Sequence, residues 1–313
     1  MSQVRLGRTG LMISPVVFGG NVFGWTMDEA ASHDLLDRMV DAGITTIDTA
    51  DVYSRWAPGH SGGESETIIG RWLAADPARR ERIQLITKVG SPMPDGGGLS
   101  ADWIARECEA SLKRLQTDRI DLYFSHRPDA DTPHEETLAA YDNLMTAGKV
   151  RAIGASNFDA AQMEAAETAA GNMTPYGAQQ PEYNLYARER FEGPLAEFCM
   201  ANDVGVIPYF SLAAGFLTGK YRTEADLTGP RGERSIAKYM DDRGMAILAA
   251  MDEVSEDTGA AHAEIALAWL MAKPSVTAPI ASATSPRQLD SLVKAAQVSL
   301  SDDNIAKLDA AGA

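Results

Sequence analysis

Asp48, Lys88 and His126 each end, or directly follow, a short apolar run of the sequence, and Tyr53 comes shortly after Asp48. The runs are rich in β-branched and aliphatic residues, which predicts short buried strands. Ionisable side chains are unusual in a core, but they are typical of the strand ends that form the catalytic face of a parallel α/β barrel. We therefore take these side chains as the candidate catalytic group.

These residue types can cooperate in the reduction of a carbonyl group. An unperturbed tyrosine, with a pKa of about 10, is a weak acid at neutral pH, so we expect the cation of Lys88 to lower the pKa of Tyr53. A buried lysine needs a carboxylate partner, which Asp48 supplies. His126 can donate a hydrogen bond to the carbonyl oxygen, and a cofactor must provide the hydride, because no side chain donates one. Asp51 has no role in this scheme.

Each of these residues alone also has a structural explanation. Asp48 could cap a turn, Lys88 could be a solvated strand end, and His126 could be a satisfied loop residue. A lysine at the end of a barrel strand can also form a Schiff base, so a barrel enzyme that uses Lys88 as its amine is an alternative. The occurrence of all these groups at consecutive strand ends favours the reductive scheme.

The elements that would position the group alternate between strand and helix. Residues 3–15 predict a hairpin, and buried strands are predicted at 16–18, 45–48, 83–88, 120–125, 150–156, 176–180, 205–209 and 276–280. Helices are expected between these strands, with two more near 286–296 and 302–311. Capping motifs at Thr26–Glu29 and Thr132–Glu135 predict two of the helix starts.

This alternation predicts a (β/α)8 TIM barrel with an N-terminal β-hairpin and an extra C-terminal helix, in a single domain of residues 1–313. An open doubly wound sheet is the structural alternative. However, it would need a glycine-rich phosphate loop after its first strand, and Gly19–Gly24 lacks that spacing. The segment 212–243 interrupts the alternation, and a long segment of this kind in a compact domain is usually functional.

The composition limits the partners and the compartment. The 313 residues carry a formal charge of −16, which argues against nucleic acid and anionic membrane, because both require a basic surface. We find no signal-peptide core and no apolar run of about 18 residues. Cys108 and Cys199 are expected to be buried thiols without a disulfide, which indicates the cytoplasm. We expect no metal site.

Several motifs, taken in order, resemble those of the aldo-keto reductase family of NAD(P)H-dependent barrel oxidoreductases, over essentially the whole length. They are Gly43–Tyr53, Thr87–Lys88, Asp121–His126, Ile153–Phe158, Gln180–Asn184 and Gly215–Tyr221. The resemblance implies that Tyr53 is the proton donor, that Asp48 and Lys88 support it, and that His126 orients the carbonyl group.

The resemblance also implies a nicotinamide dinucleotide bound along the same strand ends. Ser156, Asn157 and Gln180 match the residues that hydrogen-bond the nicotinamide carboxamide. Tyr209 matches the ring that stacks on the nicotinamide face. The other matched cofactor positions are Gly20, Asn21, Asp48, Phe210, Ser211, Leu212, Lys220, Ser282, Thr284 and Gln288.

Departures from the family pattern bear on the cofactor. Phe210-Ser211-Leu212 replaces Ser-Pro-Leu, so the pyrophosphate contact is expected to fall on backbone amides or on Ser211. Ala281–Thr284 replaces Pro-Gly or Pro-Lys, and Ser291-Leu292 replaces Glu-Asn, so the adenine contact from that asparagine is expected to be lost. Arg287 could reach a 2′-phosphate, and NADPH is favoured over NADH.

We therefore predict the reduction of an aldehyde or ketone by NAD(P)H, or the reverse oxidation of an alcohol or sugar. The small-molecule substrate would be bounded by Phe23, Trp25, Trp56 and the 89–99 loop. Arg127 could meet an anionic substrate or form a surface salt bridge, and Arg231 and Arg234 are expected to be solvated. A cofactor-loaded regulatory subunit of a membrane channel, which senses redox state, is an alternative function.

Overall fold

The computed structural model describes residues 1–227 and 235–313, and in this part of the chain eight parallel strands form one sheet. The strands are β3 (Val17–Gly19), β4 (Thr46–Asp48), β5 (Gln84–Val89), β6 (Ile120–Ser125), β7 (Val150–Ser156), β8 (Ala178–Gln180), β9 (Gly205–Val206) and β10 (Ile280–Ala281). From β3 to β9 they are neighbours in chain order, and β10 returns to pair with β3.

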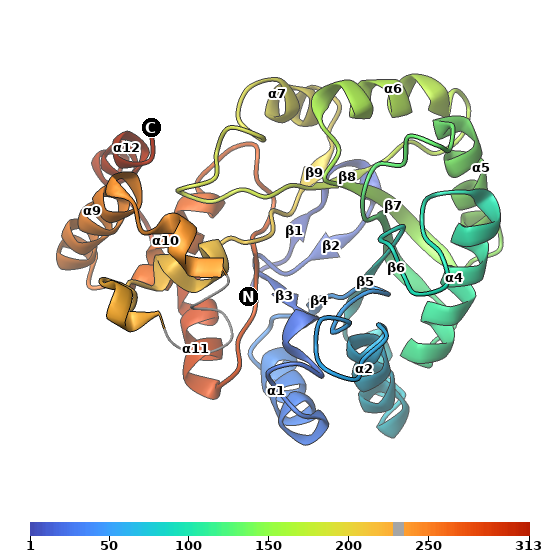
Figure 1. Ribbon diagram of the computed structural model, residues 1–313, viewed down its shortest axis with the longest axis horizontal. Coiled ribbons are helices and arrows are strands. Elements are labelled where there is room, and N and C mark those ends of the chain that lie inside the picture. The colour runs from blue at the N-terminus through green and yellow to red at the C-terminus, as the bar shows by residue number, and fades with distance from the viewer. Residues whose placement is uncertain (228–234) are drawn as a thin grey trace.

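Backbone hydrogen bonds connect the two ends of this sheet. The N–H of Thr277 donates to the carbonyl oxygen of Val206 (2.8 Å), and the N–H of Ile280 donates to that of Pro208 (2.9 Å). Figure 1 shows the helices around the outside of the strands. The fold is the predicted (β/α)8 barrel.

The described helices lie in the connections between strands, except for the last two, which follow β10. They are α1 (Glu29–Asp41), α2 (Glu64–Ala75), α3 (Ala78–Glu81), α4 (Ala101–Leu115), α5 (His134–Thr146), α6 (Ala160–Ala170), α7 (Pro194–Ala201), α9 (Asp242–Thr258), α10 (His262–Met271), α11 (Pro286–Ala295) and α12 (Asp302–Ala311). The predicted extra C-terminal helix is α12, which packs against α9 and is joined to it by the ion pair of Lys307 and Glu253 (2.8 Å). Among the described helices, none has the length and apolar character needed to cross a membrane.

The predicted N-terminal hairpin lies against the barrel end opposite the candidate site. Its strands β1 (Val4–Arg5) and β2 (Met12–Ile13) pair antiparallel, and the N–H of Arg8 donates to the carbonyl oxygen of Asp203 (2.7 Å), just before β9. Apolar hairpin residues pack with inward-facing strand residues in one buried cluster, which includes Leu6, Leu11, Ile13, Val17, Ile86, Leu122, Phe124, Ala152 and Ile207. The hairpin therefore covers the bottom of the barrel.

Two of the predicted helix starts differ in detail. The cap of α1 is Asp28, whose carboxylate accepts the N–H of Ala31 (2.9 Å), because Thr26 belongs to the preceding turn and donates its N–H to Val22. At α5 the cap position is Pro133, with no side-chain cap, and the Thr132 hydroxyl donates instead to Asp129 (2.8 Å). Both expected threonine caps are therefore wrong.

In its described residues, the segment between β9 and α9 contains short 3₁₀ turns and no long helix or strand. The described turns are η3 (Ala213–Thr218), η4 (Glu224–Asp226) and η6 (Ala237–Tyr239). Arg231 and Arg234, which were expected to be solvated, lie outside the described residues.

Candidate active site

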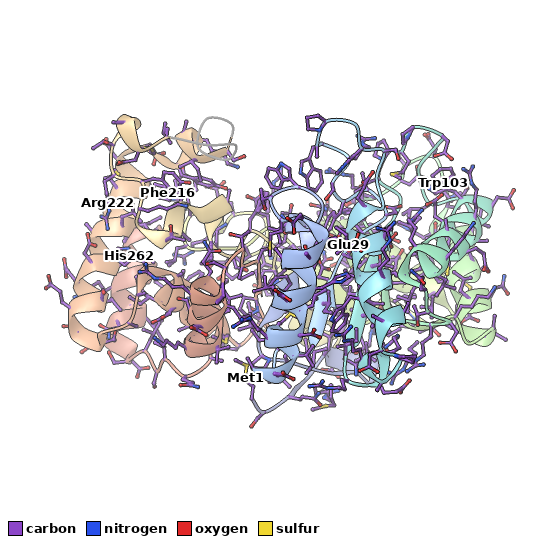
Figure 2. All side chains as sticks on the ribbon, turned by 90° about the horizontal axis from the view of Figure 1, so that it is seen from below. Met1, Glu29, Trp103, Phe216, Arg222 and His262 are labelled. Carbon is purple, nitrogen blue, oxygen red and sulfur yellow. The ribbon has the colours of Figure 1, made fainter. Side chains whose placement is uncertain are left out.

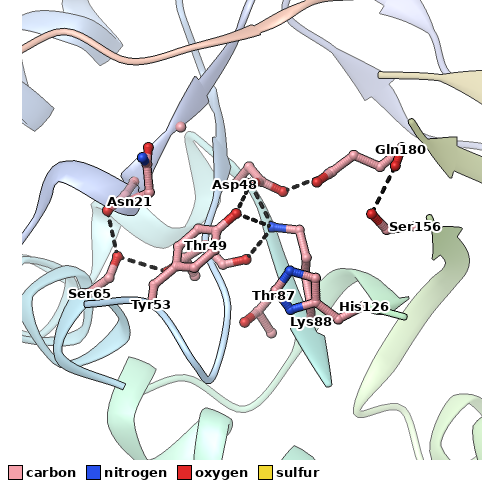
Figure 3. Close-up of polar contacts among 12 residues, drawn as sticks. Asn21, Asp48, Thr49, Tyr53, Ser65, Thr87, Lys88, His126, Ser156 and Gln180 are labelled. Atoms are coloured by element: carbon pink, nitrogen blue, oxygen red, sulfur yellow. Dashed lines mark hydrogen bonds and ion pairs between the residues drawn. The ribbon is translucent and has the colours of Figure 1, made fainter. Parts of the chain in front are cut away.

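The four candidate catalytic residues meet at the C-terminal end of the barrel (Figure 3). Asp48 is the last residue of β4, Lys88 lies near the end of β5, and His126 directly follows β6. Tyr53 is in the turn after β4, which brings its hydroxyl back over the strand ends. Because parallel strands end on the same side of a barrel, residues far apart in sequence converge here.

The Lys88 side chain is fully buried and is held by three oxygen atoms. Its Nζ lies 2.7 Å from Asp48 Oδ2, 2.7 Å from the carbonyl oxygen of Thr49 and 2.9 Å from the Tyr53 hydroxyl oxygen. An ammonium group has three N–H donors, so all of them are used. This arrangement fixes the position of the cation beside the phenol.

Asp48 connects this cation to the next part of the site. Its Oδ2 also accepts a hydrogen bond from the Tyr53 hydroxyl (3.3 Å), and its Oδ1 accepts one from Gln180 Nε2 (3.0 Å). Gln180 ends β8, which is the fourth strand after β4 in the sheet. Asp48 is therefore in contact with three polar groups, which come from two strands and one turn, and its buried carboxylate is compensated by them.

The net pKa shift of Tyr53 is opposite to the direction expected from the sequence. Burial raises the pKa of the phenol well above 10, and the adjacent Asp48 carboxylate adds to the increase because it opposes a second negative charge. The pKa of Lys88 is lowered by burial, although Asp48 counteracts this effect. Tyr53 is thus held in its protonated form, which is the form that can give up a proton.

His126 is kept neutral by its surroundings. Burial lowers the pKa of its imidazole well below 6.5, and the nearby cations of Lys88 and Arg127 lower it further. Its ring lies edge-on to that of Tyr53, with 6.1 Å between centroids, and Nδ1 has no partner among the described residues. A neutral imidazole beside the phenol can donate a hydrogen bond to an oxygen atom that approaches Tyr53.

A second set of polar residues continues from Gln180 across the barrel end. Ser156, the last residue of β7, donates to the carbonyl oxygen of Gln180 (2.8 Å). Asn157 Nδ2 donates to the Ser156 hydroxyl (3.1 Å) and to the carbonyl oxygen of His126 (2.9 Å), and Asn157 Oδ1 accepts from the Tyr209 hydroxyl (2.8 Å). The residues matched to nicotinamide binding are therefore brought together and joined to the catalytic group.

The segment after Tyr209 has an unusual backbone. Phe210, Ala213 and Ala214 have φ angles of 52°, 47° and 57°, in the left-handed region that non-glycine residues rarely adopt. Successive N–H groups in such a conformation can form a concave anion site. Ser211 is buried and its hydroxyl donates to the carbonyl oxygen of Pro208 (3.1 Å). Of the two expected pyrophosphate contacts, this geometry favours backbone amides, because the Ser211 hydroxyl already has a partner.

The residues matched to the adenosine half lie on the opposite side of the barrel end. The Ser282 hydroxyl is 2.7 Å from both the carbonyl oxygen of Gly19 and Oδ1 of Asn21. A Cβ on Gly19 would lie 2.7 Å from Ser282 Oγ, so this close approach requires glycine. Gln288 Oε1 accepts from both the N–H (2.8 Å) and the hydroxyl (3.1 Å) of Thr284.

The remaining matched cofactor positions have different surroundings. Gly20 begins the turn after β3, where its carbonyl oxygen accepts the Ser65 hydroxyl (2.8 Å). Leu212 is half-buried against the core. Lys220 is exposed, and its ammonium packs 4.9 Å from the ring centroid of Tyr221. Leu292 is buried in the core, so no polar side chain takes the place of the family asparagine.

Comparisons with known proteins identify the family of the chain. Residues 15–313 match the model of the aldo/keto reductase family. The chain belongs to the aldo/keto reductase family. This membership supports oxidoreduction with a nicotinamide cofactor as the general class of chemistry.

Several curated members of the family are similar along nearly their whole length. An uncharacterized oxidoreductase of Bacillus subtilis, YrpG, is 35% identical over 99% of this chain and 95% of its own. The aldo-keto reductase AMT2 of Alternaria alternata is 32% identical over 97% of this chain and 90% of its own. A probable voltage-gated potassium channel subunit beta of Arabidopsis thaliana is also 32% identical, over 95% of this chain and 92% of its own.

The aromatic residues that were predicted to bound the substrate of this aldo/keto reductase have different surroundings. Phe23 is fully buried and stacks on Phe18 with 5.5 Å between centroids, so it belongs to the core and its prediction as a wall is wrong. Trp56 is 45% exposed and lies edge-on to Tyr53 (5.9 Å) and to Trp25 (5.7 Å). These two tryptophans extend the site outward from the phenol.

Sequence reasoning missed residues that support the site from behind. Ser65 of α2 contacts the Thr49 hydroxyl (2.8 Å) as well as Gly20, and so joins the turns after β3 and β4. Asp51, which received no role, is fully buried, and both of its carboxylate oxygens have no partner among the described residues. Polar residues that face a helix instead of the barrel mouth carry no distinct sequence signal.

Proposed function

We propose that this protein reduces an aldehyde or ketone, or oxidises an alcohol or sugar in the reverse direction, with NADPH or NADH. The observation that carries the proposal is the contact of buried Lys88 with Asp48, Thr49 and Tyr53. The phenol is neutral before reaction, and a cation lies 2.9 Å from the oxygen that becomes negative when the proton leaves. Such a preorganised charge stabilises the state that forms on proton transfer.

Each residue of the group has one task in this proposal. Tyr53 donates its proton to the substrate oxygen, and Lys88 stabilises the phenolate that remains. Asp48, held by Gln180, keeps the ammonium group charged and in place. His126 donates a hydrogen bond that orients the carbonyl group. When bound, the nicotinamide would supply the hydride, which no side chain can provide.

The described residues fit a nicotinamide dinucleotide. The half-buried ring of Tyr209 can stack on the nicotinamide, and the left-handed backbone after it offers N–H groups to a pyrophosphate. On the adenosine side, Arg287 lies exposed in the first turn of α11, which contains no acidic residue. We favour NADPH because a guanidinium at this position can pair with a 2′-phosphate.

The test is turnover of NADPH or NADH with a panel of aldehydes, ketones and keto-sugars. We expect Tyr53→Phe to lower kcat by about 10²–10⁴-fold, as the loss of a general acid does, with little change in cofactor affinity. Tyr141→Phe is the matched control, because its phenol is buried in α5 against Ser125 and outside the site. The proposal fails if neither nucleotide binds or if Tyr53→Phe turns over normally.

Two alternatives remain to be separated from this proposal. A Schiff-base enzyme would lose activity in Lys88→Met, keep most of it in Tyr53→Phe, and be trapped by borohydride; full burial of the Lys88 ammonium disfavours this reaction. The similarity to a protein named as a probable potassium channel subunit favours a redox-sensing subunit as the second candidate. That function would be supported by tight cofactor binding without turnover of any carbonyl in the panel.

We further propose that residues 1–313 act as one domain and work in the cytoplasm. The family match over residues 15–313 supports the first point. The free, buried thiols of Cys108 and Cys199 support the second, because reduced cysteines are typical of that compartment.

A further inference from the structure

Phe210 is a large apolar side chain that the fold leaves exposed at the mouth of the barrel. Its side chain is 46% exposed, and it directly follows Tyr209, whose hydroxyl is tied to the site through Asn157. Most other large apolar side chains of the described residues are buried. Packing in the core therefore does not explain why an aromatic residue stands here.

The backbone of Phe210 is also held in a costly conformation. Its φ of 52° lies in the left-handed region, which is strongly disfavoured for a bulky side chain. The carbonyl oxygen of Phe210 accepts hydrogen bonds from Asn184 Nδ2 (2.9 Å) and from the N–H of Ala213 (2.6 Å). Asn184 is itself fixed, since its Oδ1 accepts the N–H groups of Tyr186 (2.9 Å) and Ala187 (2.8 Å).

These contacts hold the peptide, whereas the ring is left outside. A backbone strained in this way persists only where its surroundings enforce it, and such strain is concentrated at functional sites. Glycine or asparagine would adopt the same φ at lower cost. The choice of phenylalanine is therefore not explained by the turn alone, which indicates that the ring itself has a use.

The ring of Phe210 makes an edge contact with the ring of Tyr209. Their centroids are 5.2 Å apart and their planes make an angle of 66°. Tyr209 is anchored at its far end by the bond to Asn157, whose φ of 64° is also left-handed. Burial raises the pKa of Tyr209 to about 12, so its phenol remains neutral at the pH at which the protein works. A flat ring that stacks on Tyr209 would meet the ring of Phe210 at its edge.

We propose that the Phe210 ring closes over the nicotinamide half of the bound cofactor, at the edge of the Tyr209 stack, and slows its release. This inference rests on the proposed function, because it assigns the nicotinamide to the face of Tyr209. It assigns to Phe210 a side-chain role in retention, separate from any contact made by its backbone N–H. The affected step is cofactor dissociation and not proton transfer at Tyr53.

The test is a substitution series that separates the ring from the backbone. Phe210→Tyr keeps a ring and the strain, Phe210→Asn and Phe210→Gly lose the ring and relieve the strain, and Phe210→Ala loses only the ring. The dissociation rate of NADPH is measured by stopped-flow fluorescence after mixing with an excess of NADP⁺. We expect this rate to rise about tenfold in the Asn, Gly and Ala variants. The Tyr variant should remain within about twofold of the parent protein.

The adenosine half of the cofactor gives an internal control. Adenosine 2′,5′-bisphosphate lacks the nicotinamide, so its Kd should be the same in all four variants. Met200→Ala, which removes a 53% exposed side chain from α7, should change neither quantity. Thermal unfolding should show the Gly and Asn variants at least as stable as the parent, since both relieve strain.

The outcomes separate this inference from the proposed function. Unchanged dissociation in the Gly and Asn variants, with turnover intact, would overturn the role of the ring alone. A loss confined to the Ala variant would also overturn it, because the backbone conformation would then be the determinant. If the parent protein bound neither NADPH nor NADH, the proposed function would fail first.

Discussion

Asp48 and Asp51 are close neighbours at the end of β4, but their carboxyl groups have opposite environments. Asp48 accepts hydrogen bonds from Lys88, Tyr53 and Gln180. Asp51 has no partner for either oxygen among the described residues and lies near Glu66 and Glu107. Burial raises the pKa of Asp51 well above its usual value, the two glutamates add to the increase, and Arg114 only partly opposes it. The sequence distinguishes these two aspartates poorly, because one ends a strand and the other lies three residues after it.

This difference predicts a pH-dependent stability in which Asp51 opposes folding. Between the ordinary pKa of Asp51 and its raised pKa in the folded protein, the native Asp51 holds a proton that the unfolded chain has lost. The free energy of unfolding therefore falls as pH rises, by up to about 1.4 kcal/mol per pH unit. Asp51→Asn removes this proton linkage. In urea unfolding, we expect the stability of the Asp51→Asn variant relative to the parent protein to increase from pH 5 to pH 8. Stabilities of the variant and the parent protein that differ by the same amount at every pH would show that Asp51 ionises alike in the folded and unfolded states.

At the scale of the elements, hydrophobic periodicity predicted most helices and strands, and local tertiary contacts decided the rest. The expected strands at 120–125 and 150–156 match β6 and β7 to the residue. The strands β9 and β10 are shorter than expected, and the hydrogen bonds that close the barrel also involve Pro208 and Thr277, which lie outside these strands. The segment 212–243 has no periodicity in its sequence. Its described residues contact α9 through Arg222 and α10 through η3, and the local sequence does not show these contacts.

These contacts predict that a side chain is not tolerated at Gly219, the residue after η3. Arg222 pairs with Asp252 of α9 (2.7 and 2.9 Å) and donates to the carbonyl oxygen of Gly219 (2.9 Å), and His262 of α10 contacts the same aspartate (3.0 Å). Figure 2 shows Phe216, Arg222 and His262 on the same side of the molecule. A Cβ at Gly219, where φ is 76°, would lie 1.9 Å from His262 Nδ1.

We expect Gly219→Ala to destabilise the protein by about 2–4 kcal/mol, from the clash and the left-handed backbone together. In a double-mutant cycle, adding His262→Ala to Gly219→Ala should remove the clash. A destabilisation of about 1–2 kcal/mol should then remain from the left-handed backbone. Urea unfolding of the four proteins measures the coupling. If the two losses simply add, the imidazole is not the obstacle, and the inferred anchoring of this segment on α10 is wrong.

At the scale of the whole molecule, the barrel separates chemistry at one end from stability at the other. The alternation of strands and helices was enough to predict the barrel and the convergence of Asp48, Lys88 and His126. It was not enough to predict the bond between Asp48 and Gln180, or the net pKa shift of Tyr53. Both depend on distances across the closed barrel and on burial, and these quantities appear only when all strands are in place.

The bottom of the barrel holds a buried ion-pair network that should control stability without affecting catalysis. Asp121, at the start of β6, accepts from Arg80 (2.8 Å) and Arg151 (2.8 Å) and from the N–H of Leu85 in β5 (2.8 Å). Both Asp121 and Arg80 are buried. His126 follows the other end of the same strand, about 17 Å away at about 3.3 Å per residue.

We expect Asp121→Asn to destabilise the protein by about 3–5 kcal/mol, because it leaves the Arg80 guanidinium buried without its counter-charge. Asp203→Asn breaks an exposed pair with Arg5 and should have little effect. Urea unfolding gives the stabilities, and kcat/KM measured well below the unfolding transition should be unchanged in both variants. A loss of turnover in folded Asp121→Asn protein would mean that the two ends of the barrel are coupled, since the strand that carries Asp121 also positions His126.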